Sequence, residues 1–240
     1  MNPQAMGPHG AALLAYFRGD TQAELVIRRD DGLEDRLPVS HFFRPPEQFF
    51  PIEVVALERC RGRVLDIGAG TGLHSLVLQS RGLSVIAIDV SSLAVTIMQE
   101  SGVEHPRWAD IYSFDDGPFD TLLMLGHGIG MAEDLAGLDR FLAHARTLVR
   151  REGQVLVHSH DVRKTQDPRH LAYHDANRRA GRYIGEIRMQ FVFAGETGPM
   201  CGWLHVDPET LMRHAERAGW GCDIVLEEES GDYLARLTLL

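Results

Sequence analysis

The sequence has few cysteines and no long apolar run, and each shortage excludes a class of protein. Its three cysteines, Cys60, Cys201 and Cys222, show no C-x-x-C spacing. This excludes a disulfide framework and a thiolate zinc site, and favours a reducing compartment. No apolar run reaches transmembrane length, and the first ten residues lack the features of a secretory signal. We therefore predict a cytoplasmic protein with no membrane partner.

Positive charge is also scarce, and lysine is almost absent. Only Lys164 is a lysine among the 24 basic residues, which we interpret as a composition bias without functional meaning. The net charge of −10 repels phosphate backbones, so nucleic acid is disfavoured as a partner. At 240 residues the chain is long enough for one good core. Nothing in the sequence indicates the oligomeric state.

Strands rich in Val, Ile and Leu alternate with helical segments between residues 63 and 160. This pattern predicts a parallel sheet covered by helices on both faces. We expect its strands at 63–70, 83–90, 105–111, 119–126 and 153–160, and the intervening helices at 71–82, 91–102 and 135–151.

The rest of the chain divides around this alternating part. We predict that residues 1–52 form an N-terminal segment with a frayed start, a helix at 11–19, a β-hairpin and an aromatic lid. Residues 53–240 then form the main domain, and 162–206 form an antiparallel insert on its substrate side. The chain is expected to close with a helix at 207–220, capped by Asp207, and a final hairpin.

A glycine loop joins the first predicted strand to the first helix. Gly68, Gly70 and Gly72 allow a sharp turn and a close approach of a ligand to the main chain. The acids Asp89 and Asp110 end the next two strands, where open α/β sheets bind ligands. The first suits ribose hydroxyls and the second, beside Ile111, suits adenine. The G-x-G-x-G spacing is one residue tighter than the dinucleotide-binding fingerprint.

The segments 64–72, 85–90, 108–111 and 119–126 together resemble the class I S-adenosylmethionine-dependent methyltransferases, of the small-molecule type. The resemblance covers residues 53–161 and returns over 207–240. It implies an α/β, Rossmann-like, doubly wound seven-stranded sheet with an antiparallel last strand, and S-adenosylmethionine as cofactor. One departure is Glu152, where a paired glycine is common. The expected cofactor-binding residues are Asp66, Gly68, Ala69, Gly70, Gly72, Asp89, Val90, Asp110, Ile111, Leu125 and Gly126.

A second glycine-rich stretch follows the fourth predicted strand and contains His127. The resemblance implies that this loop lies beside the transferable methyl group. Methyltransferases of nucleic-acid amino groups carry an Asp/Asn-Pro-Pro-aromatic sequence here, and this chain has Gly126-His127-Gly128-Ile129 instead. This difference disfavours nucleobases as acceptors. His127 is our candidate catalytic base or acceptor contact. The alternative is a neutral side chain that packs over the cofactor or hydrogen-bonds the loop.

The sequence His158-Ser159-His160-Asp161 follows the fifth predicted strand and raises the question of a metal site. Hard ions such as Mg²⁺ prefer oxygen ligands, and one Asp among several His residues fits them poorly. We therefore predict no metal. The candidate substrate-pocket residues are Phe43, Arg44, His127, His158, His160, Tyr183 and Trp203.

These observations predict an S-adenosylmethionine-dependent enzyme that methylates a small organic molecule by direct in-line displacement. An NAD(P)-dependent oxidoreductase is one alternative, which the glycine spacing disfavours. A non-catalytic cofactor-binding or regulatory protein of the same fold is the other. The acceptor, and whether its oxygen, nitrogen or carbon is methylated, leave no mark in the sequence.

Overall fold

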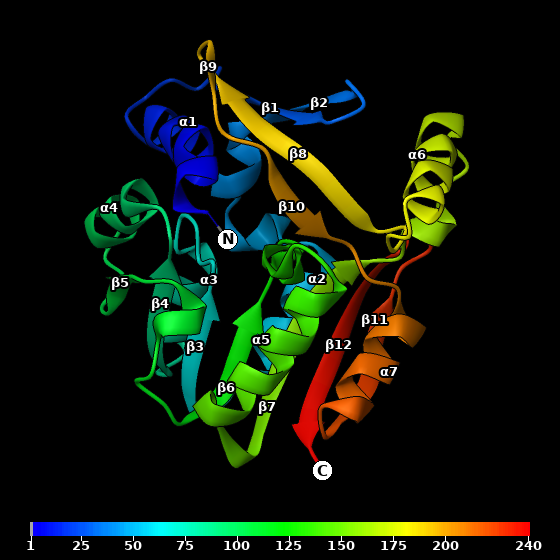
Figure 1. Ribbon diagram of the computed structural model, residues 1–240. Helices are drawn as coiled ribbons and strands as arrows, with labels where there is room; N and C mark the ends of the chain where they lie inside the picture. Colours follow the sequence, from blue (N-terminus) through cyan, green and yellow to red (C-terminus); the bar gives the residue numbers. More distant parts are fainter. Residues whose placement is uncertain (1) are drawn as a thin grey trace. The chain divides into compact units, whose positions relative to one another are not determined.

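The alternation of buried strands and helices gives the predicted mixed sheet, seen in a computed structural model that describes residues 2–240 (Figure 1). Within these residues seven strands pair in one sheet, and β12 runs antiparallel to its neighbours, which confirms the predicted fold class. In sheet order the strands are β11 (Trp220–Glu227), β12 (Asp232–Leu239), β7 (Val149–His160), β6 (Phe119–Met124), β3 (Arg63–Ile67), β4 (Ser84–Asp89) and β5 (Pro106–Trp108).

The helices begin at the capping residues that the sequence offers. Ser91, Asp134 and Asp207 each accept a backbone N–H of the following helix, and prolines occupy the first turns of several helices. The α-helices are α1 (Gly7–Phe17), α2 (Pro51–Arg59), α3 (Leu73–Ser80), α4 (Ser92–Glu100), α5 (Leu135–Leu148), α6 (Pro168–Arg179) and α7 (Pro208–Arg217). Short 3₁₀ helices are η1 (Pro3–Met6), η2 (Val39–Phe43), η3 (Pro46–Gln48), η4 (Ile111–Ser113), η5 (Gly128–Ala132) and η6 (Val162–Lys164).

A second sheet unites the N-terminal hairpin with the insert, two segments that are far apart in the sequence. The hairpin pairs Val26 with Arg36, and its first strand also pairs with the insert, Val26 opposite Val192. The sequence predicted both antiparallel parts but gave no sign that they pair with each other. The strands are β1 (Glu24–Arg29), β2 (Glu34–Pro38), β8 (Glu186–Phe193), β9 (Glu196–Thr197) and β10 (Cys201–Leu204).

The described residues divide into two compact units, which we describe separately. Unit 1 extends to Phe114 and includes Arg188–Cys201; unit 2 comprises Asp115–Ile187 and Gly202–Leu240. The predicted division of the chain at residues 52 and 53 stays a prediction. Within residues 2–240 we find no helix with the length and apolarity that a membrane crossing requires.

Three local expectations were wrong. Residues 2–10 are not frayed, because they form η1 and the start of α1, with Ala5 fully buried; Met1 lies outside the described residues. Helix α5 ends at Leu148, three residues early, because Val149 already pairs with Phe119 of β6. The insert at 162–206 is not antiparallel throughout, because its first half contains α6, which Asp167 caps and a proline begins.

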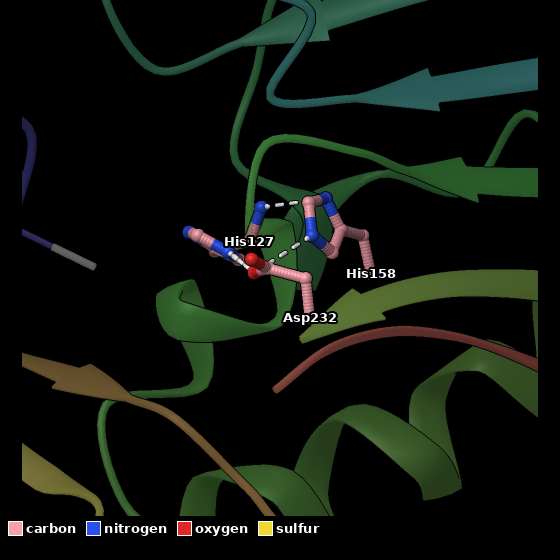
Figure 2. Close-up of side chains that lie close together, drawn as sticks. All are labelled: His127, His158 and Asp232. Atoms are coloured by element: carbon pink, nitrogen blue, oxygen red, sulfur yellow. Dashed lines mark hydrogen bonds and ion pairs between the residues drawn. The ribbon is translucent and has the colours of Figure 1, made fainter. Parts of the chain in front are cut away.

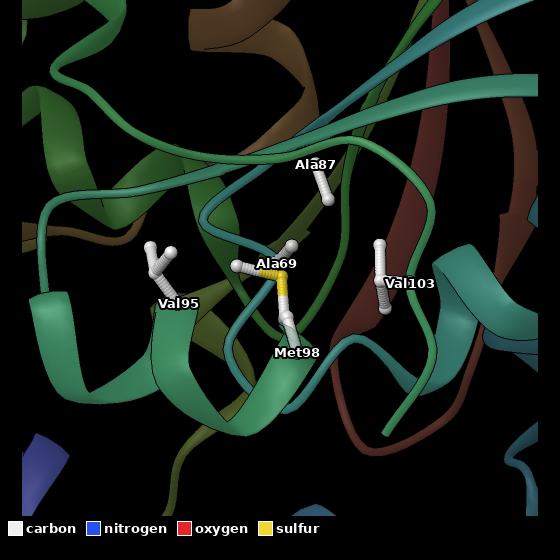
Figure 3. Packing of buried hydrophobic residues seen from close by; sticks show 5 residues of the cluster. All are labelled: Ala69, Ala87, Val95, Met98 and Val103. Atoms are coloured by element: carbon white, nitrogen blue, oxygen red, sulfur yellow. The ribbon is translucent and has the colours of Figure 1, made fainter. Parts of the chain in front are cut away.

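A small apolar cluster supports the first glycine loop in unit 1. Figure 3 shows its side chains, from the loop itself, β4, α4 and the turn after it. A Cβ on Gly72 would lie 2.7 Å from Cγ2 of Val103 and 2.9 Å from Cγ of Met98, whereas a Cβ on Gly70 would meet nothing within 4 Å. The loop can therefore approach its support only because residue 72 lacks a side chain. The cluster comprises Ala69, Ala87, Val95, Met98 and Val103.

We expect Gly72→Ala to destabilise the protein more than Gly70→Ala. Both glycines have positive φ, 80° and 57°, so either alanine costs about 1 kcal/mol in backbone strain. Only the substitution at residue 72 also overpacks the cluster, which adds roughly 1–3 kcal/mol. Urea unfolding followed by circular dichroism measures the difference. Equal unfolding midpoints for the two variants would contradict the packing argument.

Candidate functional site

The first glycine loop, between β3 and α3, is held by a carboxylate at the end of β4. Gly68, Gly70 and Gly72 all have positive φ, which L side chains rarely adopt. The backbone N–H of Gly70 donates to Oδ2 of Asp89 over 3.0 Å, and that of Ser91 donates to Oδ1 over 2.8 Å. Asp89 therefore fixes both the loop and the start of α4.

Two of the predicted cofactor acids are buried at the ends of neighbouring strands. Burial raises the pKa of Asp89, although the hydrogen bonds from Ser91 and Gly70 partly oppose this. Asp66 is almost fully buried, and burial likewise raises its pKa, while Oγ of Ser75 donates to it over 2.7 Å. Asp66 thus ties β3 to α3, and Ala69 belongs to the apolar cluster under the loop.

The third predicted acid, Asp110, caps a short helix. Its Oδ1 accepts the backbone N–H of Tyr112 over 2.9 Å at the start of η4, and Ile111 beside it is buried. The backbone carbonyl of Val90, just after β4, accepts the indole N–H of Trp108 over 2.9 Å. Asp110 and Val90 therefore each have a local structural role in unit 1.

The predicted pocket residue Arg44 forms an ion pair inside unit 1. Its Nη2 lies 2.7 Å from Oε2 of Glu53, and Nε2 of His74 lies 2.8 Å from Oε1 of the same carboxylate. The backbone N–H of Phe50 also donates to Glu53. Burial alone would raise the pKa of Glu53, but these hydrogen bonds and charges outweigh it and lower the pKa to about 2. Arg44 already has a carboxylate partner within its own chain.

The aromatic segment predicted as a lid, residues 41–50, packs on α1 and forms a hydrogen bond with the glycine loop. Phe43, a predicted pocket residue, stacks on Tyr16 with ring centroids 4.7 Å apart. The backbone carbonyl of Phe42 accepts the hydroxyl of Thr71, in the loop, over 2.8 Å. Helix α1 also lies close to the start of α4, since a Cβ on Gly10 would lie 2.3 Å from Oγ of Ser91. The N-terminal segment is thus built into the support of the loop.

In unit 2 the second glycine stretch forms a constrained loop after β6. His127 has φ of 56°, a left-handed conformation that costs a non-glycine residue energy and is found preferentially at functional sites. A Cβ on Gly130 would lie 2.1 Å from Cε2 of Trp203, so the indole packs directly on the backbone. Leu125 is buried and Gly126 is exposed. The glycines here serve loop geometry and packing.

Four histidines and one aspartate gather around this loop, and we call them the histidine cluster: His127, His158, His160, His205 and Asp232. Oδ1 of Asp232 lies 2.6 Å from Nε2 of His127, 3.5 Å from Nε2 of His158 and 3.3 Å from Nδ1 of His160. Figure 2 shows the carboxylate pointing toward the His127 and His158 rings. The ring centroid of His205 lies 5.3 Å from that of His127.

The electrostatics of the histidine cluster are those of one anion among imidazoles. Burial alone would raise the pKa of Asp232, but hydrogen bonds from His127, His158 and His160 outweigh it and hold the pKa well below its usual range. Burial lowers the pKa of His205 well below its usual value, and the neighbouring imidazoles lower it further. Asp232 is therefore a carboxylate and His205 a neutral imidazole.

The structure brings together part of the predicted acceptor side. His127, His158 and His160 belong to the histidine cluster, but Asp161 forms a two-oxygen ion pair with Arg163 instead. The hydroxyl of Tyr183 donates to Oδ2 of Asp207, the cap of α7, over 2.6 Å. Tyr183 thus supports that helix, and Trp203 packs on Gly130.

Sequence reasoning missed two members of the histidine cluster, His205 and Asp232. Asp232 begins β12 and lies opposite His160 of β7, so its place depends on a strand pairing between residues 72 positions apart. Its only local signal was the Ser230-Gly231-Asp232 turn. Among the described residues, the donor atoms of His127, His158 and Asp232 lie within 4.8 Å of one another, close enough to hold a metal ion.

A family described as methyltransferase domain matches residues 65–157. A crystal structure of an S-adenosylmethionine-dependent methyltransferase from Bacteroides fragilis, in complex with S-adenosyl-L-homocysteine, is 31% identical. The match covers 100% of this chain and 97% of that chain with a TM-score of 0.86. No curated protein matches the chain.

Two further solved structures share the fold at lower identity. The CcbJ methyltransferase from Streptomyces caelestis is 14% identical over 78% of this chain and 87% of that chain, with a TM-score of 0.59. The DhpI complex with S-adenosylhomocysteine is 18% identical over 97% of each chain, with a TM-score of 0.55.

We expect Glu53 to make stability depend on pH in the acid range. Its pKa is about 2 in the folded state against an ordinary 4.5. Its stabilisation, roughly 3 kcal/mol, is therefore complete above pH 4.5 and is lost as the pH falls toward 2. Urea unfolding between pH 2 and 7 measures this slope. Glu53→Gln should flatten it, and an unchanged slope in that variant would refute the assignment to Glu53.

Proposed function

Because the chain belongs to the S-adenosylmethionine-dependent methyltransferases, we propose that it transfers the cofactor's methyl group to a small organic molecule by direct in-line displacement. The observation that carries the family assignment is the 31% identity over the whole chain with the Bacteroides fragilis enzyme. That relationship also favours a methyltransferase over an NAD(P)-dependent oxidoreductase or a non-catalytic protein. A cytoplasmic location is part of the proposal, and the lack of a disulfide among the three cysteines supports it.

We propose that the cofactor is held by the residues that the strand ends of unit 1 present. Each carboxylate oxygen of Asp89 accepts one backbone N–H, so the carboxylate is oriented before a ligand arrives. Each oxygen keeps a second lone pair for a ribose hydroxyl. The glycine loop and Asp66 would face the methionine part, and Asp110 with Ile111 the adenine. Ala69, Gly72 and Val90 complete the proposed set in unit 1. Leu125 and Gly126, the other two expected cofactor residues, belong to unit 2 and stay predictions.

A small acceptor is supported by what the loop after β6 contains. Its sequence, Gly126-His127-Gly128-Ile129, lacks the Asp/Asn-Pro-Pro-aromatic pattern of nucleic-acid amino methyltransferases. The net charge of −10 also disfavours a nucleic acid. We propose that the acceptor meets the histidine cluster, with His127 its closest contact. His127 is the most exposed of the three histidines that face Asp232, at 36% of its side chain.

The bound cofactor supplies an activated methyl on a sulfonium whose sulfur leaves as a neutral thioether. The chain's own residues then have two tasks. They align the acceptor atom behind the methyl carbon, which is worth several kcal/mol of the barrier. They also stabilise loss of the acceptor's proton, where it carries one, and the imidazoles of the histidine cluster suit that task.

We expect calorimetry to show binding of S-adenosylhomocysteine, and Asp89→Ala to weaken it by at least tenfold. The substitution removes the ribose acceptor and frees the N–H groups of Gly70 and Ser91, and each lost charged hydrogen bond costs about 1.5–3 kcal/mol. Asp20→Ala, on the surface of the same unit, is the control and should bind as the unaltered protein does. Binding of NAD(P) with no heat from S-adenosylhomocysteine would overturn the proposed function.

We expect His127→Ala to lower kcat by one to three orders of magnitude with little change in cofactor affinity, because the side chain acts on the acceptor. The measurement is homocysteine release after a screen of hydroxyl, amine and carbon acceptors. His214→Ala is a matched control, since His214 also lies 2.6 Å from a carboxylate, that of Asp139. An equal loss of cofactor binding in His127→Ala would instead favour the packing role.

A further inference from the structure

The histidine cluster carries a feature that acceptor contact alone does not explain: three imidazole nitrogens converge on one carboxylate oxygen. The distances from Oδ1 of Asp232 to the nitrogens of His127, His158 and His160 are 2.6, 3.5 and 3.3 Å. One carboxylate is enough to orient one histidine. Several imidazole nitrogens beside one carboxylate oxygen are the donor atoms typical of a metal-binding site.

We propose that His127, His158 and Asp232 bind a divalent first-row transition-metal ion of the Zn²⁺ type, with His160 adjacent. Two ligands about 2.1 Å from one ion at the tetrahedral angle lie roughly 3.4 Å apart. The separation between His158 Nε2 and Asp232 Oδ1, 3.5 Å, already has this value. The separation between His127 Nε2 and Asp232 Oδ1, 2.6 Å, has to widen by less than about 1 Å. The donor atoms of the three residues all lie within 4.8 Å of one another, so small side-chain movements bring them to one ion.

The donor types select the kind of ion. Imidazole suits Zn²⁺, Fe²⁺, Co²⁺ and Ni²⁺, and two histidines with one carboxylate leave further coordination positions open. Mg²⁺ and Ca²⁺ require mainly oxygen ligands. The expectation of no metal rested on Mg²⁺ and on Asp161 as the only nearby acid. Asp161 forms an ion pair with Arg163. Asp232, which the sequence analysis did not identify, supplies the carboxylate beside the histidines instead.

The protein holds these donors before any ion arrives. Asp232 and His158 stand on neighbouring strands, since β12 pairs with β7 and places Asp232 opposite His160 and Leu234 opposite His158. Sites on strands are more precise than sites on loops. Oγ of Ser230 donates to Oδ2 of Asp232 over 3.1 Å and so leaves Oδ1 to face the histidines.

One contact changes when the ion binds. Nδ1 of His158 lies 3.4 Å from the backbone nitrogen of His127, a long hydrogen bond in which the ring accepts. Coordination through Nε2 moves the ring proton to Nδ1 and ends this contact. Its length means that little energy is lost, and the position of the His127 loop then follows the coordination bond.

The role of the ion rests on the proposed function, although its binding does not. His127 is partly exposed, so an open coordination position is accessible to an acceptor hydroxyl. Coordination lowers the pKa of that hydroxyl, and its proton leaves to water. The acceptor oxygen then forms the bond to the methyl carbon as the carbon–sulfur bond breaks, and the sulfur keeps the electron pair.

The test is metal binding by protein without a polyhistidine tag, stripped with a chelator and titrated with Co²⁺ and then Zn²⁺. We expect one equivalent of Co²⁺ to give visible d–d absorption bands, and Zn²⁺ to displace it. Asp232→Asn keeps the shape of the side chain but removes the anionic ligand, so it should weaken binding at least thirtyfold. His158→Gln should also abolish the bands.

The matched control is Asp139→Asn, which alters a histidine–aspartate pair of the same 2.6 Å length. Among the described residues, this pair belongs to no group of three possible metal ligands. The control variant should bind Co²⁺ as the unaltered protein does. Retained binding of S-adenosylhomocysteine in every variant shows that each one is folded and keeps the proposed function separate. No saturable Co²⁺ binding, or an unchanged spectrum in Asp232→Asn, would overturn the proposed metal site.

Discussion

The buried carboxylate of Asp89 is the constraint on which the organisation of unit 1 depends. One of its oxygens accepts the N–H of Gly70 and the other that of Ser91, so a single side chain joins the end of β4, the glycine loop and the cap of α4. Gly10 of α1 in turn packs closely against Ser91. Burial makes the charge of Asp89 costly, and the two backbone donors offset that cost only while loop, helix and N-terminal segment keep their places.

Asp89 and Asp232 show how environment gives the same side chain two different tasks. Burial dominates at Asp89 and raises its pKa, and its partners are neutral backbone donors that suit it to hold the hydroxyls of a ligand. At Asp232 the imidazoles outweigh burial and hold the pKa of the carboxyl well below its usual range. Asp89, the carboxylate proposed to bind the ribose, is thus stabilised only by backbone dipoles. Asp232, the carboxylate proposed to bind a metal ion, is surrounded by imidazoles.

What the sequence predicted well was local. Strand periodicity, the glycine turn and the cap Asp207 depend on a few neighbouring residues, and the resemblance implied seven strands with an antiparallel last strand. What it missed depends on contacts across long separations. Nothing near residue 232 indicated that it would face His160, because that placement comes from the register of β12 on β7. The burial of Pro8 and Gly10 likewise reflects the packing of α1 against α4, which no local pattern of Pro and Gly reveals.

In the second glycine loop, contacts from distant residues hold one histidine in an unfavourable conformation. A left-handed conformation at His127 costs energy, and it persists because the loop is fixed on both sides: Trp203 packs on Gly130, and Asp232 bonds the imidazole. A side chain that only packed would gain nothing from that conformation, since a glycine would adopt it without strain. The geometry is explained if the imidazole itself must be presented at one place, with its Nε2 turned to the carboxylate. That requirement is the same for the proposed acceptor contact and for the proposed metal ligand.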